Sequence, residues 1–201
     1  MTSPMTSPES SPGSDSRSMR ERMLAGEPYI ADDPDLSRES RRARALCHRI
    51  NTLEPDRSEE VGALFAELLG SMGEETHIRP PFFCDYGYQT HIGARTFVNH
   101  GLVCLDVARV SIGDDVQIGP NVQLLTPTHP VEPGPRRDKW EGSAPITIGD
   151  NVWLGGGVVV CPGVSIGENT VVGAGSVVVG DLPANVVAVG NPARVIRRLD
   201  A

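Results

Sequence analysis

Residues 146–180 read ITIGDNVWLGGGVVVCPGVSIGENTVVGAGSVVVG, and an aliphatic residue recurs in this stretch at every sixth position. These positions are Ile148, Leu154, Val160, Ile166, Val172 and Val178. The same step occurs earlier, at Ile92 and Val98 and again at Ile112, Ile118 and Leu124, and Gly follows most of these residues. A period of six fits neither a helix, whose period is about 3.6, nor a simple strand, whose period is about 2. The pattern therefore predicts a repeat architecture.

The hexapeptide unit predicts a coil with flat sides. Two-residue alternation inside each unit gives one side of the coil, and a small residue turns the chain at each end. Three units close a triangular coil, in which each apolar residue points inward and stacks on its counterpart one coil away. The core is then a column of Val, Ile and Leu, which agrees with an aromatic content of only 4%. A β-sandwich is the alternative, but its strand spacing would vary.

The chain divides into three predicted parts. Residues 1–18 repeat a Met-Thr-Ser-Pro unit, hold almost nothing to bury, and are expected to be disordered. Residues 19–75 form a helical region with two helices, the first capped at Ser37. Residues 76–201 form the mainly β coil domain. An excursion around 127–145, rich in Pro, Gly and charge, is expected to be a loop.

Composition excludes several classes of protein. The 18 basic and 26 acidic residues give a formal net charge of −8, which argues against a nucleic-acid partner. A polar N-terminus without a long apolar run predicts a soluble protein with neither a secretory signal nor a membrane partner. The chain has no CxxC pair among its four cysteines, which are Cys47, Cys84, Cys104 and Cys161. Reduced thiols and a cytoplasmic location are therefore expected.

His129 is the histidine best placed for chemistry. It lies in Thr128-His129-Pro130 at the start of the excursion, and the following Pro disfavours a helical backbone at His129. A neutral imidazole here could act as a general base, contributing about 10² to 10⁴ in rate. Composition alone favours the other interpretation, an exposed loop histidine. Zinc-dependent hydration enzymes with hexapeptide coils have a second ligand histidine a few residues away, which His129 lacks, so no metal is expected.

Other candidate residues each have two interpretations. Gly155-Gly156-Gly157 is either a corner of the coil or a set of backbone N–H groups open to an oxyanion. Arg194, Arg197 and Arg198 either bind phosphates or form a solvated terminal cluster. Three polar residues that border apolar runs would most often be turn residues; they are Asp85, Asn99 and Asp106.

Several motifs together resemble one family. They are Met23-Leu24-Ala25-Gly26, PPFFCDYG at 80–87, Leu105-Asp106-Val107, Thr128-His129-Pro130, PITIG at 145–149 and Gly190-Asn191-Pro192-Ala193. On these motifs the chain from about Met19 to Leu199 resembles the maltose, galactoside and nodulation sugar O-acetyltransferases of the hexapeptide-repeat superfamily. The resemblance implies a left-handed parallel β-helix. It also implies a homotrimer with active sites between neighbouring chains.

The resemblance assigns roles residue by residue. It implies that His129 deprotonates a hydroxyl of a maltose-, glucose- or galactoside-like acceptor, which attacks acetyl-CoA directly without an acyl-enzyme. The acceptor-side residues that it implies are Asp85, Asn99 and Asp106. Those that it implies on the side of the co-substrate acetyl-CoA are Trp153, Gly156, Ala174, Arg194 and Arg197. The galactoside enzyme has Ser at the position of Asp85, and the family often has an acidic residue where Ile30 stands.

Three alternatives stay open at this point. The coil could be a non-catalytic trimeric scaffold or binding protein, although the presence of His129, Asn99 and Trp153 together argues against this. It could acylate an amine instead of a hydroxyl, since both reactions need a base near the thioester. The third alternative is the metal-dependent hydration enzyme. The sequence does not name the sugar, and the charged segment 131–143 favours an acceptor different from that of the galactoside enzyme.

Overall fold

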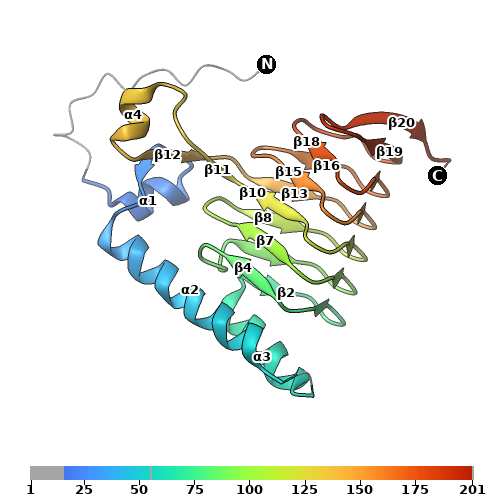
Figure 1. Cartoon of the computed structure of the whole chain (residues 1–201), viewed down its shortest axis with the longest axis horizontal. Coiled ribbons are helices and arrows are strands. Elements are labelled where there is room, and N and C mark those ends of the chain that lie inside the picture. Colours follow the sequence, from blue (N-terminus) through green and yellow to red (C-terminus); the bar gives the residue numbers. More distant parts are fainter. Residues whose placement is uncertain (1–15, 55, 201) are drawn as a thin grey trace.

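The computed structural model describes residues 16–54 and 56–200, so most of the predicted disordered segment lies outside the described residues. The chain folds into a parallel β-helix flanked by N-terminal helices (Figure 1). This confirms the predicted mainly β coil of hexapeptide repeats with a short helical region. The division into domains stays a prediction; the first strand of the coil begins at Ser71, soon after the last of the N-terminal helices ends at Leu68.

Three parallel sheets form the sides of the coil, and each is named here by its first strand. The β2 sheet contains β2 (Ser71–Met72), β5 (Thr90–Ile92), β8 (Val110–Ile112), β13 (Ile146–Ile148) and β16 (Ser165–Ile166). The β3 sheet contains β3 (His77–Ile78), β6 (Phe97–Val98), β9 (Gln117–Ile118), β14 (Trp153–Leu154), β17 (Val171–Val172), β19 (Val186–Val189) and the antiparallel β20 (Arg194–Arg198). The β4 sheet contains β4 (Phe82–Cys84), β7 (Leu102–Leu105), β10 (Gln123–Leu125), β15 (Val159–Val160) and β18 (Val177–Val178).

The residues of the six-residue step occupy the core, as predicted. They fall into three columns, one for each sheet, in which every member pairs with its counterpart one coil away. In the β3 sheet, for example, Ile118, Leu154 and Val172 are in register and at most 1% exposed. Full burial of an aliphatic side chain stabilises a fold by about 1.5–3 kcal/mol, so the columns hold the coil together without a large aromatic core.

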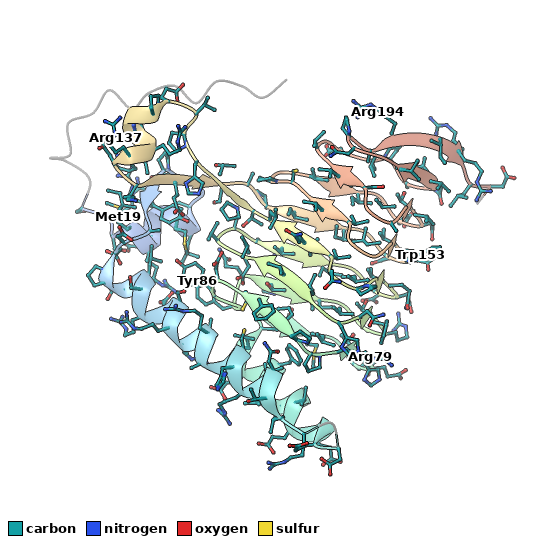
Figure 2. The ribbon with its side chains drawn as sticks, viewed as in Figure 1. Met19, Arg79, Tyr86, Arg137, Trp153 and Arg194 are labelled. Atoms are coloured by element: carbon teal, nitrogen blue, oxygen red, sulfur yellow. The ribbon has the colours of Figure 1, made fainter. Side chains whose placement is uncertain are left out.

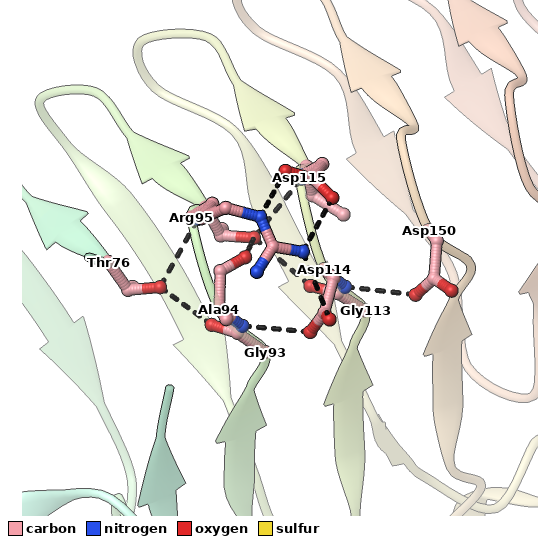
Figure 3. A network of polar contacts seen from close by, with 10 residues as sticks. Thr76, Gly93, Ala94, Arg95, Gly113, Asp114, Asp115 and Asp150 are labelled. Carbon is pink, nitrogen blue, oxygen red and sulfur yellow. Dashed lines mark hydrogen bonds and ion pairs between the residues drawn. The ribbon is translucent and has the colours of Figure 1, made fainter. Parts of the chain in front are cut away.

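The first corner of the coil, between the β2 and β3 sheets, continues the hydrogen-bond ladder with side chains (Figure 3). Asp114 accepts a hydrogen bond from the Ala94 N–H at 2.8 Å, and Asp150 accepts one from the Asp114 N–H at 2.9 Å. Arg95 forms ion pairs with Asp115 at 2.8 Å and with Asp114 at 3.3 Å. Each coil therefore satisfies backbone donors of the coil beside it where the strands end.

The N-terminal helices cover the first coils along one side of the molecule (Figure 1). They are α1 (Met19–Leu24), α2 (Pro34–Thr52) and α3 (Ser58–Leu68). The predicted cap at Ser37 is wrong: α2 begins at Pro34, because Asp33 accepts hydrogen bonds from the N–H groups of Asp35 and Leu36 and proline suits the first helical position. Buried residues of α2 and α3 join the core of the coil, which supplies the partner surface that these helices need.

The excursion is more ordered than the expected loop. It contains β11 (Pro127–Thr128), the short helix α4 (Pro133–Arg137) and β12 (Trp140–Ser143). The strand β12 pairs antiparallel with β11 and with β1 (Tyr29–Ile30) of the N-terminal segment. Backbone hydrogen bonds between segments far apart in sequence therefore fix its conformation. Among the described helices, none is long and apolar enough to cross a membrane.

Candidate active site

A cavity of about 550 Å3 lies where α2, the excursion and the third corner of the coil meet. This third corner connects the β4 sheet to the β2 sheet. The side chains that line the cavity include Tyr29, Ser40, Arg41, Arg44, Asp85, Tyr86, His129 and Glu141. Two of the predicted site residues, Asp85 and His129, are thus brought together from positions 44 residues apart in the sequence. A larger hollow of about 720 Å3 beside α3 contains none of the predicted residues.

His129 reaches the cavity from the end of β11. Its side chain is exposed, and Pro130, which follows it, is buried. The strand β11 pairs with β12, which fixes the backbone before His129. The ring of Pro130 restricts the backbone after it. An exposed imidazole on a fixed backbone is able to exchange a proton with a bound molecule.

Asp85 follows β4 directly and is half-buried in the cavity wall. Burial raises the pKa of Asp85 to about 6, and the nearby carboxyl groups of Asp106 and Glu141 add to this effect. A carboxyl group with a pKa in this range changes its charge near neutral pH. Asp85 can therefore accept hydrogen bonds from hydroxyl groups as a carboxylate, or hold a proton itself.

Asp106 lies behind the cavity and does not line it. The side chain is fully buried, and it accepts hydrogen bonds from the N–H groups of Tyr86 at 2.9 Å and Gln89 at 3.2 Å and from the Thr90 hydroxyl at 3.1 Å. Burial raises its pKa, and the hydrogen bonds from Tyr86 and Thr90 oppose the rise. In this chain Asp106 supports the turn after Asp85, and its role toward an acceptor stays a prediction.

Sequence reasoning missed other residues of the cavity wall. The sequence indicated Glu141 only as part of the charged segment 131–143. In the structure it accepts a 2.8 Å hydrogen bond from the buried Tyr29 hydroxyl and lines the cavity. Arg41 and Arg44 come from α2. No local pattern marks these residues, because their proximity depends on the pairing of β1 with β12 and on the packing of α2 against β4.

A second group of predicted residues follows the β3 sheet. Trp153 is 55% exposed on β14, and its strand position is in register with Val171, Val187 and Arg197 on the successive strands. Arg194 and Arg197 are both exposed on β20. The two arginines therefore lie on the same sheet as the indole, farther along the coil axis.

The second corner, between the β3 and β4 sheets, holds Asn99, Gly156 and Ala174. Asn99, Gly119 and Gly155 occupy equivalent positions on successive coils. The Asn99 N–H donates a hydrogen bond to Ile118 O at 2.9 Å, and the Gly119 N–H donates one to Leu154 O at 2.8 Å. Gly156 accepts a hydrogen bond from Gly175 at 2.9 Å. Among the hydrogen bonds of the described residues, none uses the Gly156 N–H, which is thus available to an external acceptor. The structure brings Asn99 to this corner and not to the cavity with Asp85.

The two groups of residues lie at different edges of the coil. In Figure 2, Tyr86, which adjoins Asp85, and Trp153 are on opposite sides of the sheets. The cavity group offers an imidazole and hydrogen-bonding groups. The residues of the β3 sheet and of the second corner together offer an indole, a free N–H and two guanidinium groups. Within the described residues, no group of three or more His, Cys, Asp or Glu side chains is arranged to bind a metal.

Comparison with known proteins gives consistent matches. Residues 22–73 match the model of the maltose acetyltransferase hexapeptide capping motif, and residues 145–180 match the bacterial transferase hexapeptide model of six repeats. The galactoside O-acetyltransferase of Escherichia coli is 41% identical over 90% of this chain and 90% of its own length. Nodulation protein L of Rhizobium leguminosarum is 47% identical over 89% of this chain and 94% of its own length.

Solved structures agree with these matches. The crystal structure of a maltose O-acetyltransferase from Clostridium difficile has a TM-score of 0.91 and 41% identity, covering 93% of this chain and 100% of that chain. A galactoside acetyltransferase in complex with coenzyme A has a TM-score of 0.88 and 41% identity, covering 92% of each chain.

Proposed function

Because this chain belongs to the maltose and galactoside O-acetyltransferase family, we propose that it transfers the acetyl group to a hydroxyl of a sugar, with His129 as the general base. The chain is an acetyl-CoA-dependent acetyltransferase. The observation that carries the finer proposal is the cavity, in which the exposed His129 imidazole shares one wall with the carboxyl groups of Asp85 and Glu141. Hydroxyl groups of a sugar are natural partners for such carboxyl groups.

The proposed reaction uses the His129 imidazole for proton transfer and the Gly156 N–H as a hydrogen-bond donor. An unprotonated nitrogen of His129 takes the proton of the acceptor hydroxyl while that oxygen bonds to the acetyl carbon. The Gly156 N–H donates a hydrogen bond to the carbonyl oxygen as its negative charge develops. His129 then returns the proton to the departing sulfur as the carbon–sulfur bond breaks. The products are the acetylated sugar and a free thiol, so no acyl-enzyme forms and no cysteine reacts.

The residues of the β3 sheet fit the co-substrate. Trp153 and the free Gly156 N–H are placed for the thioester arm, and the exposed Arg194 and Arg197 suit phosphate groups. Ala174, beside Gly156, is a further contact in this proposal. Metal chemistry has no part in it.

The separation of the two groups supports a homotrimer with sites between chains. His129 lies beyond the third corner and Asn99 at the second, so a neighbouring chain would bring one edge against the other. Light scattering on the purified protein should then give about three times the chain mass of 21.5 kDa. A monomer at working concentrations would contradict the shared site. We place the enzyme in the cytoplasm, which its four free cysteines support.

The decisive experiment measures thiol release from acetyl-CoA with a panel of sugars, aminosugars and small amines. We expect release that depends on a sugar hydroxyl and that falls about 10²- to 10⁴-fold in His129→Ala. The matched control is His77→Ala, which removes an exposed histidine outside the cavity and should keep full activity. Equal release in His129→Ala would remove His129 as the base. A response restricted to amines would identify an N-acyltransferase, and failure to bind coenzyme A would favour a scaffold.

A further inference from the structure

Two thiols that the proposed reaction does not use lie against each other. Cys47 on α2 and Cys84 at the end of β4 have their sulfur atoms 3.7 Å apart, although they are 37 residues apart in sequence. The other two cysteines have different surroundings: Cys104 contacts the Thr90 hydroxyl at 3.3 Å, and Cys161 lies at the edge of the coil core. Cys47 and Cys84 are therefore the pair to consider for thiol chemistry.

The backbone on both sides of this pair is held in place. The Asn51 side chain, one helical turn after Cys47, donates a hydrogen bond to Phe82 O at 3.0 Å and accepts one from Phe82 N–H at 2.9 Å. These two bonds pin α2 to the strand that carries Cys84. A disulfide needs a sulfur separation of about 2.05 Å, so the atoms must approach by roughly 1.7 Å from 3.7 Å. Rotation of the two side chains with a small helix shift is able to supply a movement of this size.

The Cys47–Cys84 pair lies beside a groove at the surface. Both residues line a groove of about 380 Å3, together with Arg44, His48 and Phe83, although their exposed fractions are only 5% and 8%. This groove distinguishes the pair from Cys104, whose side chain is fully buried.

The two thiols also differ in acidity. The hydrogen-bonding contact with the Cys84 sulfur lowers the pKa of Cys47. The same hydrogen bond, together with burial, raises the pKa of Cys84. Cys47 is therefore the thiol that ionises first, and thiolates are the reactive form of cysteine.

We propose that Cys47 and Cys84 form a reversible disulfide on exposure to a hydroperoxide, and that this bond fixes α2 against β4 beside the acceptor cavity. The Cys47 thiolate attacks one oxygen of hydrogen peroxide, the O–O bond breaks, and the released hydroxide takes up a proton and leaves as water. The Cys84 sulfur then attacks the Cys47 sulfur, and the S–O bond breaks. The second hydroxide leaves as water with the Cys84 proton. The sulfur pair loses two electrons, which the peroxide gains.

The bond would act on the cavity through two residues near the cysteines in the chain. Asp85 follows Cys84 directly, and Arg44 lines both the groove and the cavity. The disulfide moves α2 toward β4 and shifts both walls of the space assigned above to the acceptor. This part rests on the proposed function, whereas formation of the bond does not.

The test uses the full-length protein treated with hydrogen peroxide, alkylated and digested without reductant. We expect a linked peptide that contains Cys47 and Cys84, a loss of two free thiols, and full recovery after dithiothreitol. Cys47→Ser and Cys84→Ser should each abolish the link, while Cys161→Ser, the matched control, should keep it. Oxidation of Cys47 to a sulfinic acid without a link, or an unchanged thiol count, would overturn the proposal.

The effect on the cavity is measured in the linked protein. Amide hydrogen exchange in residues 34–52 should slow roughly tenfold, because the bond opposes separation of α2 from the coil. The KM for the acceptor should change severalfold while the KM for acetyl-CoA stays constant. Unchanged exchange would overturn the coupling to α2, and an unchanged acceptor KM would overturn its effect on the cavity. If every acceptor fails, the proposed function is wrong, but the linked peptide and the exchange rate still decide this inference.

Discussion

The Tyr29 hydroxyl donates a 2.8 Å hydrogen bond to the Glu141 carboxylate, 112 positions later in the chain. The two residues also face each other in the register of β1 and β12. Burial raises the pKa of Tyr29, and the bond to Glu141 raises it further, so the phenol keeps its proton and remains a donor. This contact fastens the N-terminal segment to the excursion and completes one wall of the cavity.

Tyr29→Phe should weaken both the fold and acceptor binding. Loss of the donor leaves Glu141 without its tyrosine partner, which costs about 1–3 kcal/mol of the free energy of unfolding. The KM for the acceptor should rise because Glu141 is free to move. Denaturant unfolding and steady-state kinetics measure the two effects.

Tyr88→Phe is the matched control for this change. Its hydroxyl donates a 2.7 Å hydrogen bond to Glu39, and Tyr88 does not line the cavity. We expect a similar loss of stability with an unchanged acceptor KM. An equal rise of KM in both variants would mean that the Tyr29 bond has no specific role at the site.

Asp85→Asn should make the protein more stable at neutral pH. The folded pKa of Asp85 is raised to about 6 from 3.8, so between these values the folded chain holds a proton that the unfolded chain has released. Asp85 therefore lowers the free energy of unfolding as pH rises through this window. Above pH 6 the variant should exceed the wild type by on the order of 1–3 kcal/mol, and below pH 4 the gap should close. Urea unfolding at several pH values measures this gap, and a variant less stable than the wild type at pH 8 would contradict the prediction.

Two inactive variants should restore activity when they share a trimer. Mixed assemblies of His129→Ala and Asn99→Ala chains contain some sites with an intact His129 from one chain and an intact Asn99 from its neighbour. Random mixing at equal amounts gives about a quarter of the wild-type sites. The assay is thiol release after joint refolding or coexpression.

The control mixture combines His129→Ala with Asp85→Ala. Both residues line the same cavity of one chain, so no mixed site regains both groups. Activity of the first mixture no higher than that of the control mixture would argue that each site belongs to a single chain.

Gly149→Ala should destabilise the coil, because a Cβ at this position would lie 2.7 Å from the Glu168 backbone nitrogen. The neighbouring coil must shift, at a cost of about 1–3 kcal/mol. Gly62→Ala on α3 is the control: a Cβ there meets nothing within 4 Å, and helix propensity should add roughly 0.5–1 kcal/mol. Thermal unfolding should show a lower midpoint for Gly149→Ala and a higher one for Gly62→Ala. An unchanged midpoint for Gly149→Ala would contradict the close approach of Gly149 to the Glu168 backbone.

The coil is readable from the amino-acid sequence. Ile118, Leu154 and Val172 each contact an equivalent residue of the next coil, so the fold repeats one local solution and its period is visible along the chain. The repeat also places Trp153 on the β3 sheet and Gly156 at the corner that follows it, whereas their roles toward acetyl-CoA stay predictions.

The cavity is not readable from the sequence and arises from long-range contacts. It joins Arg44 of α2, Asp85 of the coil and Glu141 of the excursion, whose proximity arises from strand pairing and helix packing that no periodic pattern encodes. Burial is likewise a property of the folded chain: Asp106 is fully buried and supports the turn after Asp85, which no sequence pattern indicated. In a repeat, the spacing along the chain decides which residues become neighbours. A site built from distant segments forms only when long-range contacts exclude water and fix the distances between its side chains.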